Sequence, residues 1–439
     1  MESIFDFTKM YAGVVSLSGE TYPCTLSFPD AKINFKLIGK PADQHAQLKL
    51  DFTGYVSTEQ GIMNYRAINS LQTHWSSGSS ELSHQEFQAD QLLVGNLSSD
   101  IDSELFEQVN ICYNHLESIG NFITFEQDGQ DDLNFSFKKY FDSIILNEDP
   151  WGSLTLENPV RYNFRNSGLQ YFKLNIDPFF SFVPKDKISL TEVQYLSYRL
   201  GWFIQLLFDI RQEPIDIVLF KKSVTLAEQR KNNPFYYLAP ELIIRKTKKI
   251  PVSRHPTLEL NQLTDYIKNC FVCWKNFDTK QLKLATLYFK EINSQEYIVD
   301  DRFKNLCSIV QGLEVLGTSK KVSNIRGEMN AKLRRASTPE LEGILSSYVS
   351  IVFLHKLYEI IGHQRDHFQH LSKLLDHDLS DNTEEFVTVN TLLKVIIRYH
   401  FLLAIALSLT EISKIIKGEM IWFNHQLRKL EKNILEKFP

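Results

Sequence analysis

The spacing of apolar residues differs between the two halves of this chain of 439 residues, and that difference most constrains its fold. Between residues 10 and 180, short runs such as CTLSF, KINFKLIG and LNFSFKKY alternate apolar with polar residues, and Gly, Pro, Asn and Asp separate them. A period of two is typical of half-buried antiparallel strands. We therefore expect an antiparallel sheet, sandwich or barrel in the N-terminal half.

One long helix interrupts this pattern, in the segment SLTEVQYLSYRLGWFIQLLFDI. Ser189 and Glu192 have the spacing of a capping box, which marks a helix start. The apolar residues that follow recur at helical spacing: Val193, Leu196, Leu200, Phe203 and Leu207. Another strand, IDIVLF, comes after this helix. Residues 221–258 are rich in Lys, Arg, Asn and Pro, so we interpret them as a connector with some local structure.

From residue 259 to the end the pattern is helical. The predicted helices are 260–276, 279–292, 300–317, 325–336, 339–361, 364–375, 386–416 and 418–436. The sequence therefore predicts an α+β chain. A β-rich domain of residues 1–258, with one long helix and the connector at its end, precedes an all-helical bundle of residues 259–439.

The composition, 43% apolar and 23% charged, indicates a globular protein. Five cysteines without regular spacing argue against a secreted disulfide framework, and the N-terminus does not resemble a signal peptide. The apolar segment from Leu392 to Leu409 contains Lys394, Arg398 and His400, so we expect a buried helix rather than a membrane span. These features favour a cytoplasmic location.

The residues with the clearest chemical meaning lie in the segment GHQRDHFQH, residues 362–370. RNA carries its own nucleophile, the 2′-hydroxyl, so its cleavage needs a proton carrier such as His370. It also needs a cation such as Arg365, whose planar guanidinium binds phosphate oxygens in a bidentate manner. Asp366 lies four residues before His370 and is expected to orient it. Arg365 and His370 are five positions apart and would not share one face of a regular helix. We therefore expect a helix to begin near Arg365, just after Gly362.

The pattern Arg365-Asp366-x-x-x-His370 resembles the R-[N/D/H]-x-x-x-H motif of HEPN domains (higher eukaryotes and prokaryotes nucleotide-binding). Residues 301–314, DRFKNLCSIVQGLE, resemble the first helix of HEPN domains in ApeA-like proteins. The β-rich half also resembles the ApeA N-terminal domain. In that family Asn often follows the Arg, whereas this chain has Asp366.

This resemblance implies a metal-independent endoribonuclease of antiviral abortive infection that needs no cofactor. Its expected substrate is RNA, with tRNA among the candidates. HEPN nucleases act as homodimers in which Arg and His of both chains meet at one cleft. The N-terminal half is then expected to sense an infection-derived trigger or to restrain the nuclease.

Glu314 is a further candidate for the site. Phe303, Cys307 and Val310 form one apolar helical stripe, and Glu314 continues it. Burying a carboxylate without a partner is costly, so we expect Glu314 to pair with Arg365.

A basic run is expected to contact the RNA backbone and to make affinity salt-dependent. Its cations are Lys320, Lys321, Arg326, Lys332, Arg334 and Arg335, opposed by Glu328. A solvated helix face is the plainer interpretation of such a run.

Two other functions remain open from the sequence. One is a HEPN domain that binds RNA or nucleotides without catalysis. The other is a metal-dependent enzyme, because four histidines fall near one helical face: His363, His367, His370 and His377. Cys270 and Cys273 form a lone CxxC, for which helix packing is the favoured interpretation.

Overall fold

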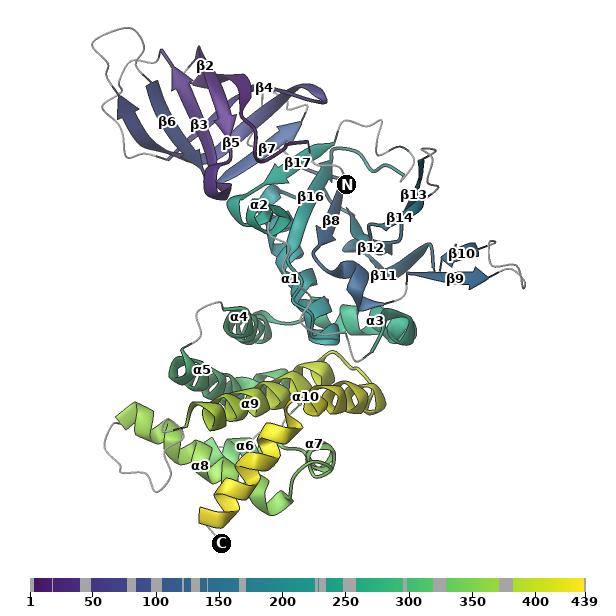
Figure 1. The fold of residues 1–439 in the computed structure, drawn as a ribbon, viewed down its shortest axis with the longest axis vertical. Helices are drawn as coiled ribbons and strands as arrows, with labels where there is room; N and C mark the ends of the chain where they lie inside the picture. Colours follow the sequence, from purple (N-terminus) through teal and green to yellow (C-terminus); the bar gives the residue numbers. More distant parts are fainter. Residues whose placement is uncertain are drawn as a thin grey trace. The chain divides into compact units, whose positions relative to one another are not determined.

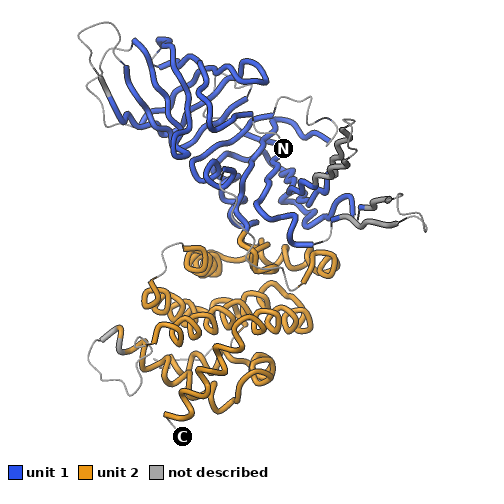
Figure 2. Tube along the Cα trace, in the orientation of Figure 1, with its two compact units in different colours: residues 1–201, 212–254 blue, residues 202–211, 255–439 orange. Residues whose placement is uncertain are grey.

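The computed structural model describes residues 4–17, 19–39, 49–76, 84–95, 105–120, 122–127, 135–139, 141–165, 171–225, 228, 234–247, 258–294, 298–318, 329–370 and 382–437. The chain divides into two compact units (Figure 2), residues 1–201 with 212–254 and residues 202–211 with 255–439. The first unit is rich in antiparallel strands, and the described part of the second is helical (Figure 1). An α+β chain with a β-rich N-terminal region is thereby confirmed.

Six strands of the first unit close into an antiparallel barrel (Figure 1). They are β1 (Tyr11–Leu17), β2 (Glu20–Ser27), β3 (Ile33–Ile38), β4 (Leu50–Thr58), β5 (Gly61–Ser76) and β6 (His84–Ala89). The barrel order is β1-β2-β3-β6-β5-β4, and closure comes from β6, which pairs with both β3 and β5.

Strand β5 can pair with β6 of the barrel and with a strand outside it because it bends in the middle. Its residues 64–68 pair with β7 (Gln91–Gly95), whereas residues 71–76 pair with β6. Between these stretches Asn69 has a φ of 54°, a left-handed conformation that Asn adopts more readily than most residues. Its backbone N–H donates to the Asp51 carboxylate at 2.8 Å, which also pairs with Arg66 at 2.7 Å. The bend is therefore fixed by side chains of β4 and β5.

The barrel interior is built from the alternating residues of its strands. Ile33, Phe35 and Leu37 of β3 are all fully buried, as the period of two predicts. Tyr65 of β5 is also fully buried, stacks on Phe35 with ring centroids 5.0 Å apart, and donates its hydroxyl to the Val14 carbonyl at 3.1 Å. Buried hydroxyls need such a partner.

Beyond the barrel, β7 continues the sheet in the order β17-β16-β8-β15-β12-β11. These strands are β8 (Gln108–Tyr113), β11 (Ser143–Asp149), β12 (Gly152–Glu157), β15 (Phe179–Pro184), β16 (Pro214–Phe220) and β17 (Phe235–Leu238). Two separate hairpins pair β9 (Ile123–Gln127) with β10 (Phe135–Lys139), and β13 (Val160–Arg165) with β14 (Tyr171–Ile176).

The interpretation of residues 221–258 as a connector is wrong for β17 and α2 (Pro240–Thr247). Strand β17 lies inside the sheet between β16 and β7, with Phe235, Tyr237 and Leu238 buried. Helix α2 packs on β16, where Lys246 pairs with Asp216 at 2.6 Å. Both elements are short and flanked by Lys and Pro, which hid their apolar pattern.

Helix α1 (Leu190–Phe208) begins where the sequence predicts. The Ser189 N–H and hydroxyl both donate to Glu192 at 2.8 Å, which is the predicted capping box. All five predicted apolar positions are buried. The last turns of α1, from residue 202, belong to the second unit, although the sequence placed the whole helix in the first domain.

The second unit contains α3 (Leu260–Lys275), α4 (Thr279–Asn293), α5 (Val299–Gly312), the 3₁₀ turn η3 (Leu313–Leu316), α6 (Met329–Ala336), α7 (Pro339–Leu345), α8 (Ile351–His370), α9 (Thr383–Ala404) and α10 (Leu409–Lys437). The predicted boundary near residue 417 is wrong. The chain turns instead at Ala406, with a φ of 59°, and Ser408 caps α10 through the N–H of Glu411 at 3.3 Å. Gly418 lies inside α10 and is buried.

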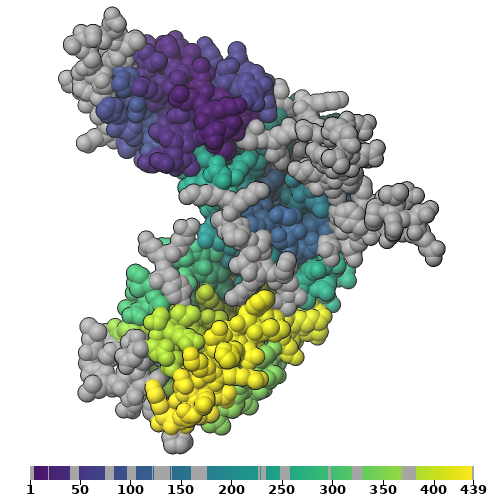
Figure 3. All heavy atoms as spheres, in the orientation of Figure 1, coloured from purple at the N-terminus to yellow at the C-terminus, as the bar shows by residue number. Residues whose placement is uncertain are grey.

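Helix α9 is long and apolar enough to cross a membrane, but 78% of its apolar stretch is buried. It packs against α5 and α10, which makes it a core helix as predicted. The last helices, coloured yellow in Figure 3, cover much of the visible face of the helical unit.

Arg398 of α9 occupies the centre of this unit and is 3% exposed. Its guanidinium donates to the carbonyls of Leu206 and Leu207, at 2.8 and 3.1 Å, and forms ion pairs with Glu419 of α10 and with Asp209, the latter at 3.6 Å. The carbonyls at a helix C-terminus lack helical partners and carry partial negative charge. Arg398 therefore joins the end of α1 to α9 and α10.

Replacing Arg398 with Leu is expected to destabilise the helical unit by about 3–5 kcal/mol, because Glu419 and two carbonyls lose a buried partner. Urea unfolding measures this change. The exposed Arg428→Leu variant is the control and should change stability by less than about 0.5 kcal/mol. Equal stability of the two variants would contradict the proposed role of Arg398.

His400 of α9 is also fully buried. Its Nε2 lies 2.7 Å from the Ala336 carbonyl and its Nδ1 lies 2.8 Å from the Thr318 hydroxyl. The carbonyl accepts only, so Nε2 carries the proton and Nδ1 accepts from Thr318. Burial lowers the pKa of His400 below its ordinary value.

Because the pKa of His400 is lower in the folded state, the unfolded chain binds a proton first. The stability that neutral His400 provides is complete above about pH 6.5 and is lost as the pH falls toward the lowered pKa. We expect His400→Gln to flatten the dependence of unfolding free energy on pH below about 6.5. The exposed His425→Gln variant should keep the wild-type slope, and a wild-type slope in His400→Gln would refute the assignment.

Candidate active site

Arg365 lies within α8, five residues before its last residue, His370. The prediction that a helix begins near Arg365 is wrong, because α8 continues through Gly362. A Cβ atom at Gly362 would lie 3.3 Å from the backbone nitrogen of Asn330. This glycine thus permits close approach of α6 and does not break α8. The predicted helix 339–361 is split instead between α7 and α8, where the Ser350 hydroxyl accepts from the Phe353 N–H at 3.2 Å.

The guanidinium of Arg365 is accessible and partly neutralised. Its Nη1 donates to Asp366 Oδ1 at 2.9 Å, and the two side chains are 22% and 36% exposed. Arg365 also acts on Cys307 of α5: burial raises the pKa of that thiol, and the positive charge of Arg365 opposes the rise. Arg365 therefore lies beside the predicted stripe of α5, with one carboxylate as its ion-pair partner among the described residues.

The last turn of α8 is held by aromatic packing. The Phe368 ring lies 5.9 Å from Phe303 of α5 and 6.0 Å from Phe386 of α9. Lys304 of α5 places its ammonium 5.0 Å from the centre of the Phe368 ring, a cation–π contact. Sequence analysis missed this cation. Its spacing of three residues from Cys307 could have placed it on the same helical face.

Glu314 does not pair with Arg365, which corrects the sequence prediction. Phe303, Cys307 and Val310 are buried as expected. Helix α5 ends at Gly312, however, and Glu314 falls in the 3₁₀ turn η3, where it is exposed. The change of helical period rotates Glu314 away from the stripe.

Half of the predicted RNA-binding run, Lys320, Lys321 and Arg326, lies outside the described residues. The other half belongs to α6, which begins beside Gly362, one turn before Arg365.

The cations of α6 are partly engaged in the unit itself. Lys332 donates to the Gln311 carbonyl at 3.2 Å, and Arg334 pairs with Glu359 at 2.6 Å. Arg335 is half-buried. The described part of the run therefore supplies a basic helix next to Arg365. Two of its three cations, Lys332 and Arg334, already contact other groups of the helical unit.

The backbone of His370 ends α8, and its side chain lies outside the described residues, as do the His367 side chain and all of His377. His363 is exposed. No group of three or more His, Cys, Asp or Glu residues in the described part of the chain is arranged to hold a metal ion. The metal-binding alternative thus concerns atoms that this structure does not describe.

The two cysteines of the CxxC lie on α3, and Cys270 is packed in the core, as the sequence predicts. Cys270 is fully buried, and Phe271 and Trp274 beside it are buried as well. Burial raises the pKa of the Cys270 thiol to about 12, so it stays protonated and unreactive at neutral pH.

Asp366→Asn is expected to free the Arg365 guanidinium while keeping the shape of the side chain. Anions should then bind more tightly, by up to about fivefold, since a partly exposed ion pair contributes about 0–1 kcal/mol. Fluorescence anisotropy of a short labelled RNA, read at several salt concentrations, measures the change. Glu384→Gln, which releases Lys429 of α10, is the matched control and should bind like wild type. Weaker binding by Asp366→Asn would show that the carboxylate supports the site rather than restrains it.

No protein-family model, no curated protein and no solved structure matches this chain. The chemistry of Arg365 and of the helices around it therefore provides the clearest indication of function in the helical unit.

Proposed function

We propose that this protein is a metal-independent endoribonuclease of the HEPN type, which acts in the cytoplasm during antiviral abortive infection. Arg365 and His370 are its catalytic residues, and Asp366 is a positioning residue. RNA, with tRNA among the candidates, is the substrate. The β-rich unit senses an infection-derived trigger or restrains the nuclease.

The observation that carries this proposal is the environment of Arg365. A guanidinium that is 22% exposed projects from a helix whose last turn is fixed by Phe303 and Phe386. A rigid base of this kind limits the movement of a charged group and so prepares it for phosphate. A second cation, Lys304, reaches the same end of α8. Together these groups support binding of a phosphodiester.

The chemistry requires no metal, because the RNA supplies its own nucleophile. His370 acts as the base that removes the proton of the 2′-hydroxyl, or as the acid that protonates the leaving 5′-oxygen. Arg365 stabilises the negative charge that builds on the phosphate oxygens. The products are a 2′,3′-cyclic phosphate and a 5′-hydroxyl end.

The continuous helix α8 favours a site shared by two chains. Positions 365 and 370 are five residues apart and are therefore separated by about 140° around a regular helix. Two positions separated in this way do not share one face of a helix. In a homodimer, Arg365 of one copy and His370 of the other can flank the same phosphodiester. The proposed active species is accordingly a homodimer or a larger homo-oligomer.

We expect Arg365→Ala and His370→Ala each to reduce RNA cleavage by at least about 100-fold, the size of a lost general-acid/base or charge-stabilising group. Purified protein and total RNA or tRNA, with analysis of the fragment ends, give this measurement. Cleavage should persist in EDTA. If the two variants complement each other when mixed, the shared site is supported, since each dimer half can supply the residue that the other lacks.

Arg428→Ala, an exposed change on α10, is the matched control and should cleave like wild type. Expression toxicity gives a second readout, with both active-site variants expected to relieve growth arrest. If wild type and both variants bind RNA alike and none cleaves or arrests growth, the protein is an RNA-binding module and the nuclease proposal fails. Cleavage that EDTA abolishes would favour the metal-dependent alternative.

A further inference from the structure

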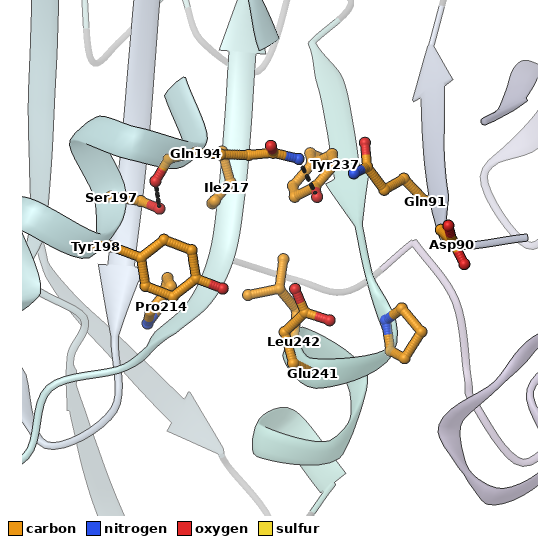
Figure 4. Close-up of a pocket in the computed structure, with 11 residues that line it drawn as sticks. Asp90, Gln91, Gln194, Ser197, Tyr198, Pro214, Ile217, Tyr237, Glu241 and Leu242 are labelled. Carbon is orange, nitrogen blue, oxygen red and sulfur yellow. Dashed lines mark hydrogen bonds between the residues drawn. The ribbon is translucent and has the colours of Figure 1, made fainter. Parts of the chain in front are cut away.

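The β-rich unit contains a cavity of about 320 Å³ between α1, α2 and the strands that connect the barrel to the open sheet. Figure 4 shows its lining, which comes from five separate segments of the chain. Its volume falls at the low end of small-molecule sites, which span roughly 300–1,000 Å³. The walls belong to regular elements that are packed in the sheet, so the cavity is preformed.

Part of the cavity wall is apolar or aromatic, from Pro214, Ile217 and Leu242 and from the rings of Tyr198 and Tyr237. Polar side chains form much of the rest of the lining: Asp90, Gln91, Gln194, Ser197 and Glu241. Gln194 donates to the Tyr237 hydroxyl at 2.6 Å, which fixes the phenol at the rim of the cavity (Figure 4). A pocket that combines apolar surface with polar groups held in fixed positions is the usual form of a ligand site.

The cavity has a negative electrostatic character. Two carboxylates line it, Asp90 and Glu241, and none of the lining residues that the structure describes is Lys or Arg. Asp90 is paired with Lys49 at 2.7 Å. Arg245, one helical turn after Glu241, pairs with Glu213 at 3.1 Å and also hydrogen-bonds to Tyr198 of the cavity wall. The charge of Glu241 thus remains available to a ligand, and the first turn of α2 stabilises it.

The two phenols next to Glu241 remain neutral. Burial raises the pKa of both Tyr198 and Tyr237, and the charge of Glu241 contributes to the rise in each case. Figure 4 shows the Tyr198 hydroxyl directed toward the Glu241 carboxylate. The Tyr198 hydroxyl is also hydrogen-bonded to Arg245, and the Tyr237 hydroxyl accepts from Gln194, so the Glu241 carboxylate is the main acceptor open to a ligand.

We propose that this cavity binds a small organic cation that carries N–H donors, such as a primary ammonium or a guanidinium. Glu241 accepts its N–H groups in a charge-assisted hydrogen bond, and the faces of Tyr198 and Tyr237 provide cation–π contact. Phosphates and nucleotides are disfavoured, because the carboxylates of Asp90 and Glu241 line the cavity and no described lining residue is Lys or Arg. The site is independent of the nuclease proposal and stands if that proposal fails.

The test uses the full chain with agmatine and tyramine as cationic probes, and with inorganic phosphate and ATP as anionic ones. Calorimetric titration and thermal unfolding should show binding of at least one cationic probe and a higher midpoint of unfolding. Glu241→Gln should weaken that binding by about tenfold or more, the size of a lost charge-assisted hydrogen bond. Tyr198→Phe, which keeps the ring, should weaken it by a smaller factor.

Glu117→Gln, an exposed carboxylate of the same unit, is the matched control and should bind like wild type. Arg365→Ala should also bind the cation unchanged, which separates this site from the nuclease. The proposal is overturned if neither cationic probe binds at millimolar concentration, or if Glu241→Gln and Tyr198→Phe both bind as tightly as wild type. Competition of phosphate or ATP for the cavity would overturn its assigned ligand class.

Discussion

The helical unit depends on the buried positive charge of Arg398, which has several polar partners. An apolar side chain at this position could not satisfy them. Arg398 donates hydrogen bonds to two carbonyls at the end of α1 and pairs with two carboxylates, those of Asp209 and Glu419. Each partner would be costly to bury without it. The interaction also explains why the last turns of α1 group with residues 255–439.

Much of the fold could be predicted from the sequence, because the period of apolar residues is a direct result of burial on one face. The alternation around Phe35 and the capping box at Ser189 both correspond to observed elements. Helix boundaries were predicted wrongly where one residue type can serve two structural roles, as glycine does at helix ends and at close helix contacts. Gly362 allows close packing of α6, and Gly418 is buried inside α10, whereas the break at Ala406 carries no glycine. Barrel closure through β6 is a long-range pairing that no local pattern encodes.

The candidate site was predictable in its residue types and less so in its geometry. Arg365 and Asp366 are neighbours in sequence, so their contact required little of the fold. The expected partner Glu314 was lost because the end of α5, two residues earlier, could not be located by periodicity. The cavity around Glu241 could not be predicted for the opposite reason, because its lining residues are far apart in the chain and meet only after folding. The spacing of Lys304 from Cys307 does indicate its helical face, but its contact with Phe368 depends on folding.

The closed barrel has a consequence for how this protein behaves in a crowded cell. Strands that have two neighbours offer no unpaired backbone groups to other chains, so the barrel resists intermolecular strand addition. Among the described strands of the large sheet, β11 is the one left with a free edge. A bulge between Ile145 and Asn147 disrupts its hydrogen-bond ladder, and Glu148 and Asp149 add negative charge near the end. The sheet thus ends in a strand that is poorly suited to act as a template for aggregation.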